Sequence, residues 1–154
     1  MEETYKPLPE QDYSLADLNL MDSMEKVTSV LGDLTFTDSY VNEISGYTVN
    51  IYRTQGVILE IALYPVEEQI VYHLWSVEVL TSEYSTSRGI RTGDYVYEVS
   101  EQYGEPSYKG TIPDKETGYD YMYWYYEDME NKRNLVFKID NEQIISIMTC
   151  MILD

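Results

Sequence analysis

The sequence predicts an α+β fold of two tandem repeats, each a helix packed on a four-stranded antiparallel sheet. Similar helix-like segments occur 72 residues apart, LNLMDSMEKVTSVLGDL at 18–34 and GIRTGDYVYEVSEQYGEP at 89–106. Each is followed by four segments in which apolar and polar residues alternate, a period typical of strands. The polar, Ser- and Thr-rich stretch between the two copies indicates a linker.

The two helical segments have matching ends and matching apolar faces. Asp22 and Asp94 stand where an N-cap carboxylate would accept hydrogen bonds from the first turn. Gly32 and Gly104 stand where a helix ends in a residue with positive φ. The apolar positions that share one helical face are Met24, Val27 and Leu31 in the first copy and Val96, Val99 and Tyr103 in the second. We therefore expect Val27 and Val99 to be buried under their helices.

The expected strands follow each helix in order. In the first copy they lie at 35–44, 46–54, 56–65 and 73–81, and in the second at 106–112, 119–127, 134–140 and 144–153. Thr54–Gly56 and Asp140–Asn141 carry residue types that tolerate tight turns, which predicts hairpins there.

These elements predict a division of the chain into four parts. Residues 1–17 contain two prolines and no apolar period, which predicts an N-terminal tether. The first α+β repeat is expected at 18–80, the linker at 81–88 and the second repeat at 89–154.

The charge of the chain limits its partners. Ten Lys and Arg stand against 28 Asp and Glu, a formal net charge of −18. Phosphate-rich nucleic acid and anionic lipid would repel such a chain, which leaves a basic protein, a cation or a neutral sugar as candidate partners. Of these we expect a protein partner, basic or neutral. No apolar run approaches the roughly 20 residues that a membrane-spanning helix needs.

The residue types and motifs of the chain do not predict catalysis. Cys150 and His73 are the only residues of their types, so an internal disulfide and a thiolate metal site are excluded. Cys150 lies in an apolar strand-like run, where a small core residue is expected and not a nucleophile. The acidic loop 113–120 fails the EF-hand pattern, since Tyr125 falls at the closing position. No nucleotide, hydrolase or metalloprotease motif is present, and we expect no enzyme activity, cofactor or metal.

Aromatic residues supply the candidate interaction surface. The chain has 17 Tyr and 2 Trp, concentrated in GYDYMYWYYE at 118–127. The 72-residue shift matches Tyr119, Tyr121 and Tyr123 with Tyr47, Val49 and Ile51, the regular apolar face of the first copy, and predicts that these residues face the helix. The opposite face would expose the candidate interaction residues Tyr52, Met122, Trp124 and Tyr126. The alternative for these side chains is packing between strands or between the two copies.

The tandem order of helix and four strands resembles the β-lactamase-inhibitor-protein-like fold. The pattern G-I-x-x-G-D…V…Y-G-x-P within 89–106 is also similar to secreted or lipid-anchored proteins of Gram-positive bacteria. The resemblance covers about residues 18–152. It implies an extracytoplasmic location, with a leader absent from this chain. The inhibitor carries disulfides that this chain cannot form, so no contact residues are carried over.

Two hypotheses about function follow. The first is a non-enzymatic extracytoplasmic binding module, protein-binding or inhibitor-like, that uses an aromatic sheet face. The alternative is a structural or envelope-maintenance protein with no ligand of its own. Exposure of Trp124, Tyr126 and Tyr52 would favour the first hypothesis, and their burial the second.

Overall fold

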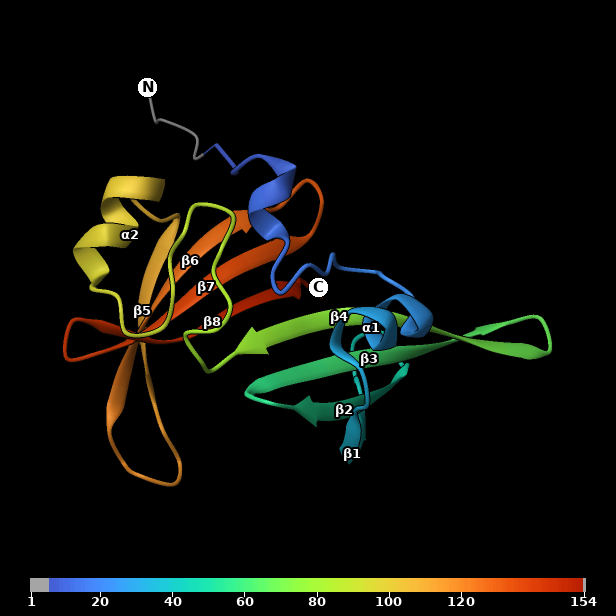
Figure 1. Ribbon diagram of the computed structural model, residues 1–154. Helices are drawn as coiled ribbons and strands as arrows, with labels where there is room; N and C mark the ends of the chain where they lie inside the picture. The colour runs from blue at the N-terminus through green and yellow to red at the C-terminus, as the bar shows by residue number, and fades with distance from the viewer. Residues whose placement is uncertain (1–5, 154) are drawn as a thin grey trace.

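The computed structural model describes residues 6–153, which form eight strands and three short helices (Figure 1). In chain order the elements are η1 (Glu10–Tyr13), α1 (Met24–Leu31), β1 (Thr35–Val41), β2 (Thr48–Thr54), β3 (Val57–Val66), β4 (Gln69–Val79), α2 (Val96–Tyr103), β5 (Tyr108–Pro113), β6 (Asp120–Asp128), β7 (Arg133–Asp140) and β8 (Gln143–Met151).

All eight strands belong to one antiparallel sheet in the order β1-β2-β3-β4-β8-β7-β6-β5. The two runs of four strands are joined by pairing of β4 with β8, from Ser76 opposite Cys150 to Val79 opposite Ile147. The predicted α+β fold of two tandem helix-plus-sheet repeats is therefore wrong. Pairing satisfies backbone groups that two separate sheets would leave open at their edges, and the two α-helices have only eight residues each. The protein is mostly β and is built on one continuous sheet.

One face of this sheet carries the main hydrophobic core. Both α-helices, η1 and the segment before α2 pack on that face, and Figure 1 shows α1 lying over β3 and β4. Val27 of α1 and Val99 of α2 are fully buried there, which confirms the predicted helical faces. The fully buried residues that the sheet contributes to this core include Leu59 and Phe137.

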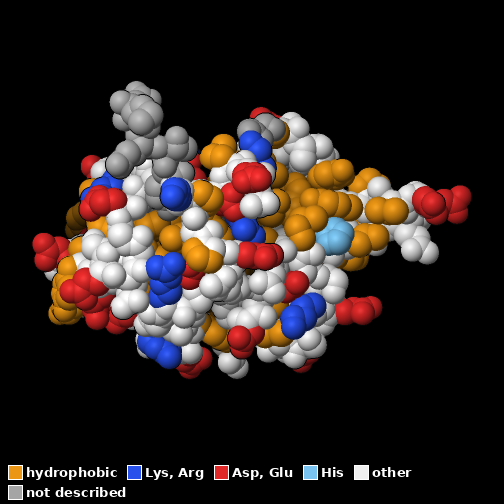
Figure 2. All heavy atoms as spheres, turned by 90° about the horizontal axis from the view of Figure 1, so that it is seen from above, with side chains coloured by type: hydrophobic (Ala, Val, Ile, Leu, Met, Phe, Trp, Pro, Cys, Tyr) orange, Lys and Arg blue, Asp and Glu red, His pale blue; other side chains and the backbone are white. Residues whose placement is uncertain are grey.

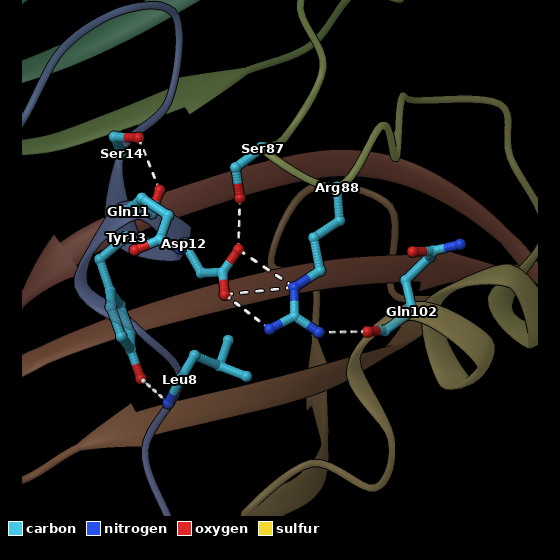
Figure 3. A network of polar contacts seen from close by, with 8 residues as sticks. All are labelled: Leu8, Gln11, Asp12, Tyr13, Ser14, Ser87, Arg88 and Gln102. Carbon is cyan, nitrogen blue, oxygen red and sulfur yellow. Dashed lines mark hydrogen bonds and ion pairs between the residues drawn. The ribbon is translucent and has the colours of Figure 1, made fainter.

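The N-terminal segment belongs to this core. Tyr13 and Leu15 are each 2% exposed, so this part of the expected tether at 1–17 packs into the core, as does Leu18 next to it; residues 1–5 lie outside the described residues. Apolar side chains at these positions bury themselves against the sheet, and the guanidinium of Arg133 lies 4.6 Å from the centre of the Tyr13 ring. The hydroxyl of Tyr13 accepts a hydrogen bond from the backbone N–H of Leu8 (Figure 3).

A buried carboxylate fastens this segment to the rest of the protein (Figure 3). Asp12 is 1% exposed and accepts hydrogen bonds from the Ser87 hydroxyl and the Arg88 guanidinium, with Arg88 Nη2 at 2.8 Å. Arg88 also donates to the backbone carbonyl of Gln102 at the end of α2. The expected linker at 81–88 is thus held between the N-terminal segment and α2.

The helix N-caps lie one residue later than predicted. Ser23 caps α1, its hydroxyl accepting from the backbone N–H of Lys26 at 3.2 Å. Asp22 instead accepts from Asn19, three residues before it. Asp94 stands in the same relation to Arg91 before α2. Both carboxylates therefore close the turn that precedes a helix.

Positive φ at both helix-ending glycines is confirmed. Gly32 has φ 78° and ψ −146°, and Gly104 has φ 75° and ψ −159°. These ψ values lie outside the left-handed helical region that asparagine tolerates and close to a region that only glycine occupies readily. A Cβ at either position would meet no heavy atom within 4 Å, so the requirement for glycine comes from the backbone alone.

Replacing Gly104 by alanine is expected to lower the free energy of unfolding by about 1–3 kcal/mol, because Cβ is disfavoured at this φ and ψ. Asparagine should cost as much, since its tolerance of positive φ applies to the left-handed helical region. Urea unfolding of both variants measures the effect. Recovery of most of the stability by asparagine would contradict the assigned conformation.

Candidate interaction surface

The aromatic strand β6 faces the opposite way from the prediction. Trp124 is 8% exposed and Tyr126 is fully buried, and both belong to the core under α2. Their partners across the sheet are Phe137 and Leu135, and the Tyr126 hydroxyl donates to the carbonyl of Gly104 at 2.8 Å. The predicted exposure of these two residues is wrong.

The error originates in β2. Val49 is fully buried, but it packs with Ala62 and Trp75 in a second, smaller cluster away from the main core. Tyr52 of the same strand is half-buried against the main core, its ring centre 5.8 Å from that of Phe36. The apolar alternation was real, but it marked the face without helices.

The four candidate residues are therefore not one exposed surface. Tyr52 lies on β2, which is separated from β6 by the four strands β3, β4, β8 and β7, and its side chain packs against the main core. Met122 is 40% exposed and, with Trp124, lines a hollow on the helix-covered side.

The face without helices among residues 6–153, here called the open face, carries a row of tyrosines that includes Tyr121 and Tyr123, which were predicted to face the helix. Tyr123 and Tyr125 lie opposite Lys138 and Val136 of β7, and Tyr108 of the edge strand β5 lies opposite Tyr125. Cross-strand partners share a sheet face, so these side chains lie on the face of the sheet that Trp124 and Tyr126 do not occupy. The tyrosine row consists of Tyr108, Tyr121, Tyr123 and Tyr125.

The rings of the tyrosine row contact one another and a lysine. The ring centres of Tyr108 and Tyr125 are 5.5 Å apart, and those of Tyr123 and Tyr125 are 6.3 Å apart. Lys138 Nζ lies 4.4 Å from the ring centre of Tyr121 and 5.9 Å from that of Tyr123. Tyr108 is 58% exposed, and the other three are half-buried. The row is a preorganised aromatic surface with one cation in it.

The other half of the open face is partly covered by the chain itself. Trp75 Nε1 donates to the Tyr64 hydroxyl at 2.6 Å, and the Tyr47 ring stacks on Tyr64 at 4.5 Å. Met151 and Leu153, at the C-terminal end of the described chain, pack against this second cluster. On this half Tyr40 is 39% exposed, and Tyr47 and Tyr64 are half-buried in contacts with the chain itself, whereas the tyrosine row lies on the other half of the open face.

The β3–β4 hairpin extends beyond its neighbours and carries a further apolar surface. β2 pairs with β3 only as far as Leu63, and β8 pairs with β4 only from Ser76. Val66 and Ile70 near its tip are 50% and 57% exposed. Figure 2 shows hydrophobic side chains gathered around the single histidine, His73.

The two residues considered for nucleophilic chemistry are held in structural roles. Burial, with the carboxylates of Glu60 and Glu78 adding to it, raises the pKa of Cys150 to about 12, which disfavours the reactive thiolate. The ring of His73 is hydrogen-bonded through Nδ1 to the carbonyl of Met21 at 3.0 Å. Among residues 6–153, no group of three or more His, Cys, Asp or Glu is arranged to hold a metal ion.

The buried carboxylate of Asp128 is held by several hydrogen bonds. Asp128 is 1% exposed and accepts hydrogen bonds from Asn131 and from Arg133 at 2.9 Å. Burial alone would raise the pKa of this carboxyl, but the hydrogen bonds from Asn131 and the Arg133 guanidinium outweigh it and hold the pKa below its ordinary value. The pair fixes the β6–β7 hairpin next to η1.

The chain matches no family model, no curated protein and no solved structure. Within the part of the chain that the structure describes, every helix is too short or too polar to span a bilayer.

Proposed function

We propose that the protein is a non-enzymatic binding module that docks a protein partner through the tyrosine row of the open face. The observation that carries this proposal is a partly exposed aromatic surface on a sheet face that no helix formed by residues 6–153 covers. Tyrosine is enriched at the centres of interfaces because its ring buries a large area while its hydroxyl keeps a hydrogen-bonding tip.

The contacts within the tyrosine row support binding with little loss of freedom. Rings that already pack on one another, and a lysine that already lies over two of them, have fewer rotamers to lose when a partner arrives. Lys138 also offers a donor for a polar group of the partner at the centre of the row. Preorganisation of this kind increases affinity without adding contact area.

The charge of the protein supports a basic partner. A net charge of −18 accelerates the approach of a positively charged protein. This electrostatic attraction weakens as ionic strength rises. The similarity of residues 89–106 to secreted or lipid-anchored proteins supports an extracytoplasmic location, which belongs to this proposal.

A structural or envelope-maintenance role is the second candidate. Burial of Trp124 and Tyr126 favours it, since those side chains serve the core. Packing of Met151 and Leu153 on the second cluster also gives part of the open face a purely structural use.

A pull-down with two matched double variants separates the candidates. Tyr123→Ala with Tyr125→Ala removes half of the tyrosine row, whereas Tyr95→Ala with Tyr97→Ala removes an exposed stacked pair on and beside α2, with ring centres 6.0 Å apart. With envelope proteins of the source organism as prey, we expect the first variant to lose a protein that the wild type and the second variant both retain. Equal retention by all three folded proteins would reject the tyrosine row and favour the structural role.

A further inference from the structure

A hollow of about 320 Å³ lies on the helix-covered side, at the end of the sheet where β6 begins and β7 turns into β8. In Figure 1 this turn lies below α2. The turn is formed by Asn141 and Glu142, with φ 50° and 65°, one residue later than predicted, and Val96 at the start of α2 also borders the hollow. The hollow is separate from the open face because its floor belongs to the main core.

The floor of the hollow is apolar and its edge is acidic. Trp124 and Ile139 are 8% and 6% exposed and form the floor together with Met122. The exposed edge carries the carboxylates of Asp120, Asp140 and Glu142. None of these three carboxylates forms an ion pair among residues 6–153, so their charges are not neutralised by the protein itself.

The Trp124 ring accommodates positive charge. Lys109 of the neighbouring strand β5 places its Nζ 4.4 Å from the ring centre and is steadied by Glu105 at 3.3 Å. Lys109 itself does not line the hollow. An indole is the most favourable aromatic partner for a cation, and methylene groups also pack on it.

We propose that this hollow binds a linear aliphatic diamine or polyamine. Such a molecule matches both parts of the site: its methylene chain covers Met122, Trp124 and Ile139, and its ammonium groups reach the separate carboxylates at the edge. A simple metal ion would leave the apolar floor uncovered, and a neutral ligand would form no charge-assisted hydrogen bonds to the three carboxylates. Three carboxylates at the edge favour a ligand with more than one ammonium group.

The test is equilibrium dialysis of the full protein against radiolabelled cadaverine at about 0.15 M ionic strength, where diffuse surface attraction is screened. We expect one saturable site. Pentylamine, with one ammonium group, should compete at least about tenfold less well, and 1,5-pentanediol, the neutral counterpart of cadaverine, should not compete.

Two double variants that each remove two negative charges locate the site. Asp140→Asn with Glu142→Gln should weaken cadaverine binding at least about tenfold. Glu67→Gln with Glu68→Gln, at the tip of the β3–β4 hairpin, should leave it unchanged. Absence of a saturable site, equal competition by the diol, or equal weakening in both variants would overturn the proposal. None of these results bears on the tyrosine row, which lies on the other face.

Discussion

Replacing Phe137 by alanine is expected to lower the free energy of unfolding by about 3–5 kcal/mol. Phe137 is fully buried on β7, and its ring centre lies 5.6 Å from that of Tyr103 and 5.9 Å from that of Tyr126. These three rings join α2 to the sheet. A helix of eight residues has little stability of its own, so removal of the central ring leaves a cavity at its main attachment.

Phe36 provides the matched control, because it is the only other phenylalanine in the chain and is 55% exposed on the edge strand β1. Its replacement by alanine should cost less than about 1 kcal/mol. Urea unfolding of the two variants gives the comparison. Similar midpoints for both would show that the core assigned under α2 is incorrect.

Replacing Asp12 by alanine is expected to cost about 3–5 kcal/mol, because removal of one member of a buried ion pair leaves its partner without compensation. The side chain of Asp12 is 2% exposed, whereas that of Arg88 is 32% exposed, which places the expected loss nearer to about 3 kcal/mol. The N-terminal segment should also exchange its amide hydrogens faster, since the carboxylate fastens it to Ser87 and Arg88.

Glu10 is the control for Asp12, because it lies in the same short helix η1 and is exposed. Glu10→Ala should change the free energy of unfolding by less than about 0.5 kcal/mol. If Asp12→Ala were equally mild, the network in Figure 3 would be a surface feature without a structural role.

Local features of the fold were predictable because they depend on neighbouring residues. Apolar spacing identified the helical faces of Val27 and Val99, and glycine identified both helix ends. The joining of β4 to β8 was not predictable in this way. Ser76 and Cys150 are far apart in the sequence, and nothing in either segment shows which other strand will satisfy its backbone groups.

The orientation of β6 was missed for a different physical reason. Alternation shows which residues share a face, but it does not show which face meets the core when both are apolar. Tyr123 and Tyr125 alternate with Trp124 and Tyr126, and both sets are aromatic. The decisive contacts are non-local, since Trp124 and Tyr126 pack on Phe137 and Leu135 under a helix. The hollow was missed because it brings together strand ends and a turn.

The claim that a partner docks on the open face is tested most directly by affinity. The protein recovered in the pull-down would be purified and titrated against the wild type and the two tyrosine double variants. The account predicts that Tyr123→Ala with Tyr125→Ala weakens binding about 100-fold or more, as loss of central aromatic contacts does. Tyr95→Ala with Tyr97→Ala should bind as the wild type does. Unchanged affinity of the Tyr123 and Tyr125 variant, in a protein that still folds, would contradict the claim.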